Sequence, residues 1–180
     1  MSGWGVPIHI VRHEHVTVER LLLPTRSYRL HRGALPEAIA VWDRIAPVVD
    51  GDTDVFLSRS RLERDARRVT GDEGLDQAFA DAGFVVMHPQ DHSIVEQIAL
   101  VARARSLVGV SGSQLHLSMF ARSCRTVIEI GDLQRRDRPL IDQVRLAEAR
   151  GHGFFFVPLV TVGEQRDVRA TLDRALTHIG

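Results

Sequence analysis

The stretch best suited to chemistry is a small polar turn, Ser111–Ser113, which reads Ser-Gly-Ser. The apolar run Leu107–Val110 precedes it and predicts a buried strand, and the helical spacing of Ser113–Arg122 predicts a helix after it. A turn from strand to helix points several backbone N–H groups and the positive end of the helix dipole at one place. Such a place binds anions, so the turn predicts a phosphate site.

An arginine-rich run, Ser58–Arg68, follows the predicted strand Asp54–Ser58. All 23 basic residues of the chain are arginines, so a P-loop lysine is excluded and any phosphate clamp must use arginine. Ligands of open parallel sheets bind at the carboxyl ends of strands, and Arg59 comes directly after such an end. The run therefore predicts at least one phosphate-binding arginine, although a solvated, salt-bridged surface has the same composition.

A third polar segment, His88–Gln97, follows the predicted strand Phe84–His88. Glu96 lies in the first turns of the next helix, where its carboxylate can accept hydrogen bonds from ribose or sugar hydroxyls. An acidic residue there also stabilises the start of a helix through the dipole. His116 lies in the first turn after the polar bend, which predicts a contact with a phosphate oxygen.

Two other motifs suggest different chemistry. Ser111 stands two residues after a glycine, as in the G-x-S-x-G nucleophile elbow of hydrolases, and Asp132 or Asp142 with His152 would complete the triad order. A serine replaces the last glycine of that motif, and the sheet before it would be short for a hydrolase. Asp52–Asp54 imitates the D-x-D pair that holds Mg²⁺ against a diphosphate. It precedes its strand and would face the opposite edge, so we expect no metal ion and no cofactor.

Five apolar runs rich in Val, Ile and Phe predict the buried strands that position these residues. The runs are Asp54–Ser58, Phe84–His88, Leu107–Val110, Thr126–Ile130 and Phe154–Leu159. Segments with helical periodicity alternate with them: Gly74–Ala82, Ser93–Arg105, Ser113–Arg122, Pro139–Arg150 and Glu164–Ile179. This alternation predicts an α/β fold, a Rossmann-like parallel sheet with helices on both faces.

The first 50 residues depart from this alternation. Pro7–Val11 and Thr17–Leu23 predict extended segments, Tyr28–Gly33 a loop and Pro36–Val49 a helix. We therefore expect a leading arm and helix over residues 1–50, packed on a domain over residues 51–180.

Composition limits the classes of partner. The net charge is zero, so no global field attracts nucleic acid. No apolar run approaches the roughly 20 residues that span a bilayer, and the residues after Met1 lack the apolar core of a signal peptide. Cys124 is the only cysteine, which excludes an internal disulfide. These features predict a cytoplasmic protein with no transmembrane segment and no nucleic-acid partner.

The order of the motifs over roughly residues 54–131 resembles glycosyltransferase family 61, which includes capsular-polysaccharide-type bacterial proteins. The shared scheme is a strand ending in Ser-Arg, then arginines, an acidic helix start, a Gly-Phe strand, a Glu-Gln helix, a glycine turn and a V-I-E-I strand. The matching residues are Ser58-Arg59, Arg67-Arg68, Glu73, Gly83-Phe84, Pro89, Glu96-Gln97, Val108 to Leu115, and Val127 to Ile130. The family's frequent histidine in the turn is replaced here by Ser111, and its asparagine before the acidic residue by Asp72.

The resemblance implies an inverting transferase of the GT-B type, of which this chain is similar to the nucleotide-sugar-binding half. Such enzymes move a hexosyl or pentosyl group from a nucleotide sugar to a glycan or other acceptor without a metal. The acceptor half would come from a homodimer, a partner chain or a longer parent protein. Without it the chain would be a non-catalytic nucleotide-sugar-binding or assembly module. No catalytic residue is assigned, and the expected donor-binding residues are Arg59, Arg64, Arg68, Glu96, Ser111, Gly112, Ser113 and His116.

Overall fold

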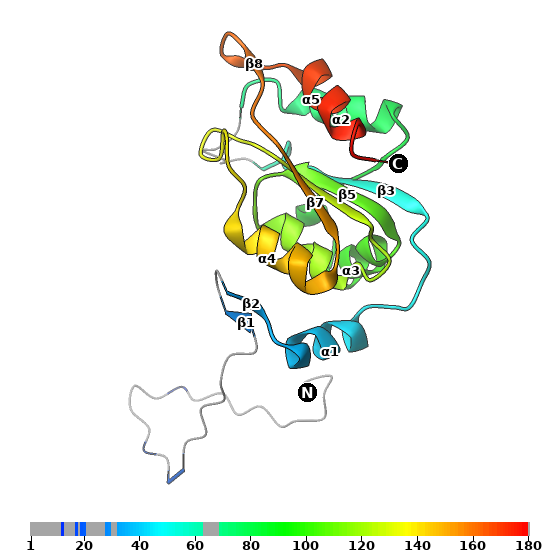
Figure 1. Cartoon of the computed structure of the whole chain (residues 1–180), viewed down its shortest axis with the longest axis vertical. Coiled ribbons are helices and arrows are strands. Elements are labelled where there is room, and N and C mark those ends of the chain that lie inside the picture. The colour runs from blue at the N-terminus through cyan, green and yellow to red at the C-terminus, as the bar shows by residue number, and fades with distance from the viewer. Residues whose placement is uncertain are drawn as a thin grey trace.

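The centre of the computed structural model is a five-stranded parallel sheet (Figure 1). The structure describes residues 12, 17, 19–20, 28–29, 32–62 and 69–179. The strands of the sheet are β3 (Thr53–Leu57), β4 (Val85–Met87), β5 (Ala104–Val110), β6 (Thr126–Ile130) and β7 (Gly153–Val157). They lie in the order β4-β3-β5-β6-β7. All five predicted strands are therefore confirmed, each with ends that differ from the prediction by three residues at most.

Helices cover both faces of this sheet. One face carries α2 (Glu73–Asp81) and α5 (Val168–Leu176), and the other carries α3 (Ile94–Ala102), η2 (Ser113–Phe120) and α4 (Ile141–Arg150) (Figure 1). Since the chain winds from β3 to β4 in one direction and returns past β3 to β5, right-handed crossovers place α2 and α3 on opposite faces. The predicted α/β fold with a parallel sheet between helices is thus confirmed.

Each face of the sheet has its own apolar core. Phe56 of β3 stacks on Phe79 of α2 with ring centroids 4.3 Å apart, and Phe84 meets Phe79 edge to face at 5.0 Å. The neighbouring Val55 and Leu57 point to the opposite face and join a second buried cluster. Burial on both faces explains why β3 reads as a continuous apolar run rather than an alternating one.

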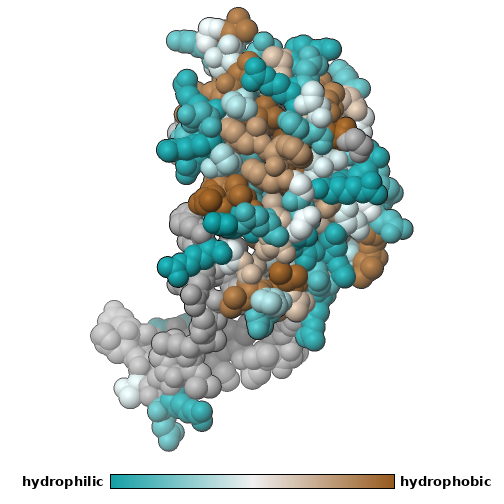
Figure 2. Space-filling view, in the orientation of Figure 1, coloured by the Kyte–Doolittle hydropathy of each residue, from teal (hydrophilic) through white to brown (hydrophobic). Residues whose placement is uncertain are grey.

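The strand β7 forms one edge of the sheet and is less covered. Figure 2 shows apolar side chains gathered along the middle of the face above this strand, between hydrophilic flanks. Phe155 of β7 stays 37% exposed and stacks on His178, with ring centroids 4.2 Å apart.

The segment after β5 is a 3₁₀-helix, whereas its spacing predicted an α-helix. A 3₁₀-helix has three residues per turn, which places residues i and i+3 on the same side. Leu115 and Ser118 have this separation and are both fully buried. The helix predicted over Ser93–Arg105 also ends early, because Arg105 belongs to β5, where its side chain pairs with Asp54 of β3.

Two hairpins stand where the sequence predicted other structure. Tyr28–Gly33, predicted as a loop, contains β1 (Tyr28–Arg29) and the start of β2 (Gly33–Ala34). The predicted helix over Glu164–Ile179 begins instead as a hairpin of β8 (Thr161–Val162) and β9 (Gln165–Arg166), joined at a glycine with positive φ. The helix starts only at α5, where Asp167 caps it by accepting from the N–H of Ala170 at 2.9 Å.

In the described part of the first 50 residues, α1 (Pro36–Ile45) packs against the domain. Asp43 of α1 pairs with Arg150 of α4 at 2.8 Å and with Arg122 at 3.5 Å. The predicted extended segments Pro7–Val11 and Thr17–Leu23 lie almost wholly outside the described residues, and the domain boundary at residue 50 stays a prediction. None of the described helices is long and apolar enough to cross a bilayer.

Candidate functional site

The fold brings two of the predicted phosphate-binding segments together. β3 and β5 are neighbours in the sheet, and the chain leaves them in opposite directions across it. In open parallel sheets, ligands bind in the crevice at the carboxyl ends of such a strand pair. Ser58 and Arg59 follow the end of β3, and Ser111 and Gly112 follow the end of β5.

Arg59 connects the two segments directly. Its Nη1 donates a hydrogen bond to the backbone carbonyl of Ser111. The same nitrogen lies 3.7 Å from Asp132 Oδ2, a carboxylate just past β6 that is fully buried. Asp132 also accepts from the backbone N–H groups of Gln134 at 2.9 Å and Arg135 at 2.8 Å. The guanidinium therefore lies at the carboxyl ends of β3, β5 and β6.

Gly112 permits this approach. A Cβ at this position would lie 2.9 Å from Nη1 of Arg59 and closer still to the side-chain oxygen of Gln114. In the described part of the chain, no group accepts a hydrogen bond from the backbone N–H of Gly112, Ser113 or Gln114. A small bend whose backbone donors have no partner in the described part of the chain, beside a guanidinium, is an arrangement that suits an anion.

A pocket of about 380 Å³ opens beside this bend. Its walls come from the segments after β3, β4 and β5, and among the described residues that line it only Arg59 is charged. Polar amide groups from Gln90, Gln97 and Gln114 share the walls with apolar side chains such as Leu62. The pocket thus joins one cationic end to a neutral, amide-lined space.

Glu96 has a structural role at the start of α3. Its Oε2 accepts hydrogen bonds from the backbone N–H of Ser93 at 2.8 Å and from the Ser93 hydroxyl at 2.7 Å. This capping box lowers the pKa of Glu96, chiefly through the Ser93 hydroxyl. The adjacent Gln97 lines the pocket and donates to the carbonyls of Pro89 and His92. The predicted contact of Glu96 with a sugar stays a prediction.

His116, Arg64 and Arg68 are the remaining predicted site residues. Burial lowers the pKa of His116, and the carboxylate of Asp142 on α4 acts against that shift. Its predicted contact with phosphate stays a prediction. Arg64 and Arg68 fall outside the described residues.

The structure adds a buried carboxylate that sequence reasoning did not place in the site. Glu129 of β6 is fully buried, and both its oxygens lie 3.1 Å from the backbone N–H of Leu140. Burial raises its pKa, while the hydroxyl of Ser111 and the N–H of Leu140 act against that rise. A charged residue inside the apolar run Thr126–Ile130 was the available signal, because an acid buried in a strand must find donors.

The hydrolase alternative fails on topology. His152 directly precedes β7, whereas Ser111 directly follows β5. Because all five strands are parallel, His152 lies at the amino-terminal ends of the strands and Ser111 at their carboxyl-terminal ends. His152 Nε2 lies 2.9 Å from the carbonyl oxygen of Ala121, and burial lowers the pKa of the ring to about 4. No Ser-His-Asp triad forms from these residues.

The buried His152 makes stability depend on pH. In the unfolded chain its pKa returns to about 6.5, so between pH 6.5 and pH 4 only the unfolded state takes up the proton. We expect acidification across this window to cost the fold about 3 kcal/mol through this residue. Urea unfolding at several pH values should show a shallower loss for His152→Gln than for the parent. His92→Gln, which changes an exposed histidine, should keep the parent's profile, and equal profiles for all three proteins would contradict the assignment.

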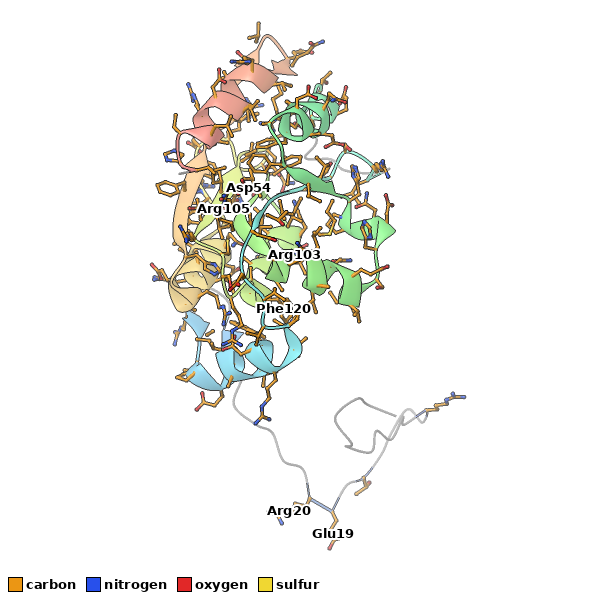
Figure 3. The ribbon with its side chains drawn as sticks, turned by 90° about the vertical axis from the view of Figure 1, so that its right-hand side faces the viewer. Glu19, Arg20, Asp54, Arg103, Arg105 and Phe120 are labelled. Carbon is orange, nitrogen blue, oxygen red and sulfur yellow. The ribbon has the colours of Figure 1, made fainter. Side chains whose placement is uncertain are left out.

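The D-x-D motif lies at the amino-terminal end of β3, as its position in the sequence predicted. Figure 3 shows Asp54 and Arg105 side by side there, with Arg103 close by. Arg103 pairs with Asp52 at 3.0 Å and lowers its pKa. Asp52 and Asp54 therefore both form ion pairs with arginines, at the opposite end of the strands from the Ser111–Ser113 bend. Among the described residues, no group of three or more His, Cys, Asp or Glu side chains is arranged to hold a metal ion.

Comparison with known proteins places the chain in a family. The family model described as Glycosyltransferase 61 matches residues 5–128, which is more than two thirds of the 180-residue chain. The match includes both Arg59 and the Ser111–Ser113 bend. No curated protein and no solved structure gives a significant match.

Proposed function

Because the chain belongs to glycosyltransferase family 61, we propose that it binds a nucleotide diphosphate sugar at the bend beside Arg59 and transfers the sugar to a glycan or other acceptor. The observation that carries this proposal is the hydrogen bond from Arg59 to the carbonyl of Ser111, which brings the arginine to the polar turn. A cation, backbone donors that have no partner among the described residues, and the point where the strand order reverses then coincide at one place.

The diphosphate would lie against Arg59 and the backbone N–H groups of Gly112 and Ser113, where the guanidinium fork and the N–H dipoles match its oxygens. The nucleoside would extend into the amide-lined pocket of about 380 Å³. Hydroxyls of a ribose can exchange hydrogen bonds with the amide of Gln90. They can also donate to the amide oxygen of Gln97, whose N–H groups already bind the carbonyls of Pro89 and His92.

In the proposed reaction, an acceptor hydroxyl oxygen forms a bond to the anomeric carbon as the bond from that carbon to the diphosphate breaks. The bonding electrons leave with the diphosphate, and Arg59 stabilises the charge that develops there. The hydroxyl proton passes to a base that we do not assign to this chain. We propose that the acceptor half of a GT-B enzyme supplies that base, and that the protein works in the cytoplasm.

Calorimetric titration with UDP, GDP and inorganic pyrophosphate tests the binding step, with and without EDTA. We expect a nucleoside diphosphate to bind more tightly than pyrophosphate, and EDTA to leave the affinity unchanged. A parallel assay for release of free nucleotide from UDP- and GDP-sugars tests turnover. Binding without turnover would favour a non-catalytic module, and the absence of any binding would contradict the proposed function.

Gly112→Ala tests the bend with little disturbance of the fold. The backbone at Gly112 is extended, with φ of 160°, so alanine adopts it without strain. The new methyl group would displace only the ends of two flexible side chains, Arg59 and Gln114. We expect UDP binding about tenfold weaker, because a misplaced charge-assisted hydrogen bond costs on the order of 1.5 kcal/mol. Thermal unfolding should stay close to the parent's, and unchanged UDP affinity would contradict the proposed site.

A further inference from the structure

A single carboxylate on α2 holds both neighbours of Arg59. The hydroxyl of Ser58 donates to Asp76 Oδ1 at 2.5 Å, and the hydroxyl of Ser60 donates to Asp76 Oδ2 at 2.5 Å. Asp76 lies in the first turn of α2, and Ser58 is 1% exposed. The two oxygens of one side chain therefore bind the residues on either side of the arginine.

Further hydrogen bonds complete the support of this segment. The backbone N–H of Ser58 donates to the carbonyl of Met87 at 2.8 Å, and the N–H of Ser60 donates to the Ser58 hydroxyl at 3.1 Å. His88 approaches from the end of β4, with Nε2 3.6 Å from Asp76 Oδ2. The backbone that carries Arg59 is thus held by β4 on one side and by α2 on the other.

We propose that Asp76 is a positioning residue for Arg59, which it holds at the bend through Ser58 and Ser60. Arginine has many rotamers, and its contribution to binding rises when the surrounding structure has already fixed the guanidinium. Two charge-assisted hydrogen bonds to one rigid helix limit the movement of the Cα of Arg59. The proposal deepens the proposed function, because it explains how the site is organised before a diphosphate arrives.

Asp76→Asn is the sharpest variant for the first test, because it keeps the shape of the side chain but leaves one acceptor oxygen for two hydroxyls. The readout is the side-chain Nε–Hε NMR signal of Arg59, assigned by its absence from Arg59→Ala. This measurement needs no ligand and is independent of the proposed function. We expect the signal to broaden or shift in Asp76→Asn and to stay in place in Asp81→Ala, which removes an exposed acid from the same helix. An unchanged signal in Asp76→Asn would overturn the proposal.

The second test is a double-mutant cycle on UDP affinity. We expect Asp76→Asn to weaken UDP binding about five- to tenfold in the parent, and to cause no further loss when Arg59 is already alanine. Equal losses in both backgrounds would show that Asp76 does not act through Arg59, and would overturn the proposal. If the parent itself binds no UDP, the proposed function fails, and the NMR test alone decides the positioning role. If Asp76→Asn does not fold, Ser60→Ala removes one of the two links and should give smaller effects in the same direction.

Discussion

Replacing Arg59 with alanine is expected to weaken binding of UDP roughly 10- to 150-fold, which corresponds to about 1.5–3 kcal/mol for a charge-assisted hydrogen bond. The loss is expected to be this large because Arg59 is the only charged side chain among the described residues that line the pocket. Among the described residues, the lining of the pocket contains no second cation that could replace Arg59. Calorimetry on parent and variant measures the difference.

The same substitution also affects the fold. The fully buried Asp132 loses a cation 3.7 Å away, and the carbonyl of Ser111 loses a donor. Asp132 keeps its hydrogen bonds from the N–H groups of Gln134 and Arg135, so we expect the variant to fold with a stability loss of about 1–3 kcal/mol. Binding must therefore be measured well below the unfolding temperature.

The matched control is Arg61→Ala, two residues along the same segment. Arg61 pairs with Asp91 at 2.7 Å, but its side chain is 64% exposed, and exposed pairs contribute little. This variant should keep UDP affinity within about twofold and stability within about 1 kcal/mol. Similar UDP losses for the two variants would show that the effect is one of general positive charge and not of the site. Parent-like affinity in Arg59→Ala would place the clamp elsewhere.

Arg166→Met is expected to destabilise the fold by about 3–5 kcal/mol, because it removes one partner of a buried ion pair. The Arg166 side chain is fully buried, pairs through Nε with Asp72 and donates through Nη2 to the carbonyl of Gly131 at 2.8 Å. It thereby ties β9 to the start of α2 and to the loop that carries Asp132. Urea unfolding at pH 7 measures the loss.

Two companion variants test this account of Arg166. Arg169→Ala breaks an exposed pair with Asp173, and we expect it to cost under about 0.5 kcal/mol. Adding Asp72→Asn to Arg166→Met should recover part of the stability, because no uncompensated carboxylate then stays buried. A loss below about 1 kcal/mol for Arg166→Met alone would show that the pair contributes little to the fold.

The helices and strands could be predicted largely from short sequence patterns. Apolar runs with helical segments between them predicted every strand of the central sheet, because a parallel strand covered on both faces is apolar at most of its positions. Start and stop signals were equally local: Ser93 caps α3, and Gly151 ends α4 with a positive φ. The helix predicted over Glu164–Ile179 forms as α5, but its predicted start at Glu164 was wrong, because the glycine turn at Gly163 leads into a β-hairpin there.

The candidate site was predicted only in outline. That Arg59 and the Ser111–Ser113 bend share an edge follows from a parallel sheet, since both segments come directly after strands. Which strands are neighbours does not follow, because crossover direction depends on packing between elements far apart in sequence. For Glu96, the capping box and the sugar contact use the same residue type at the same position, and the structure shows that the box is formed.

The sequence by itself therefore determined the strands, most of the helices, the family resemblance and the arginine directly after β3, since each depends on residues close together in the chain. Only the tertiary structure decided that Asp132 approaches Arg59, that Asp76 holds the two serines beside it, and that His152 lies at the opposite edge from Ser111. These pairings form because buried polar groups need hydrogen-bond partners, and the partners come from residues far apart in the sequence. Local periodicity does not indicate which residues will pair.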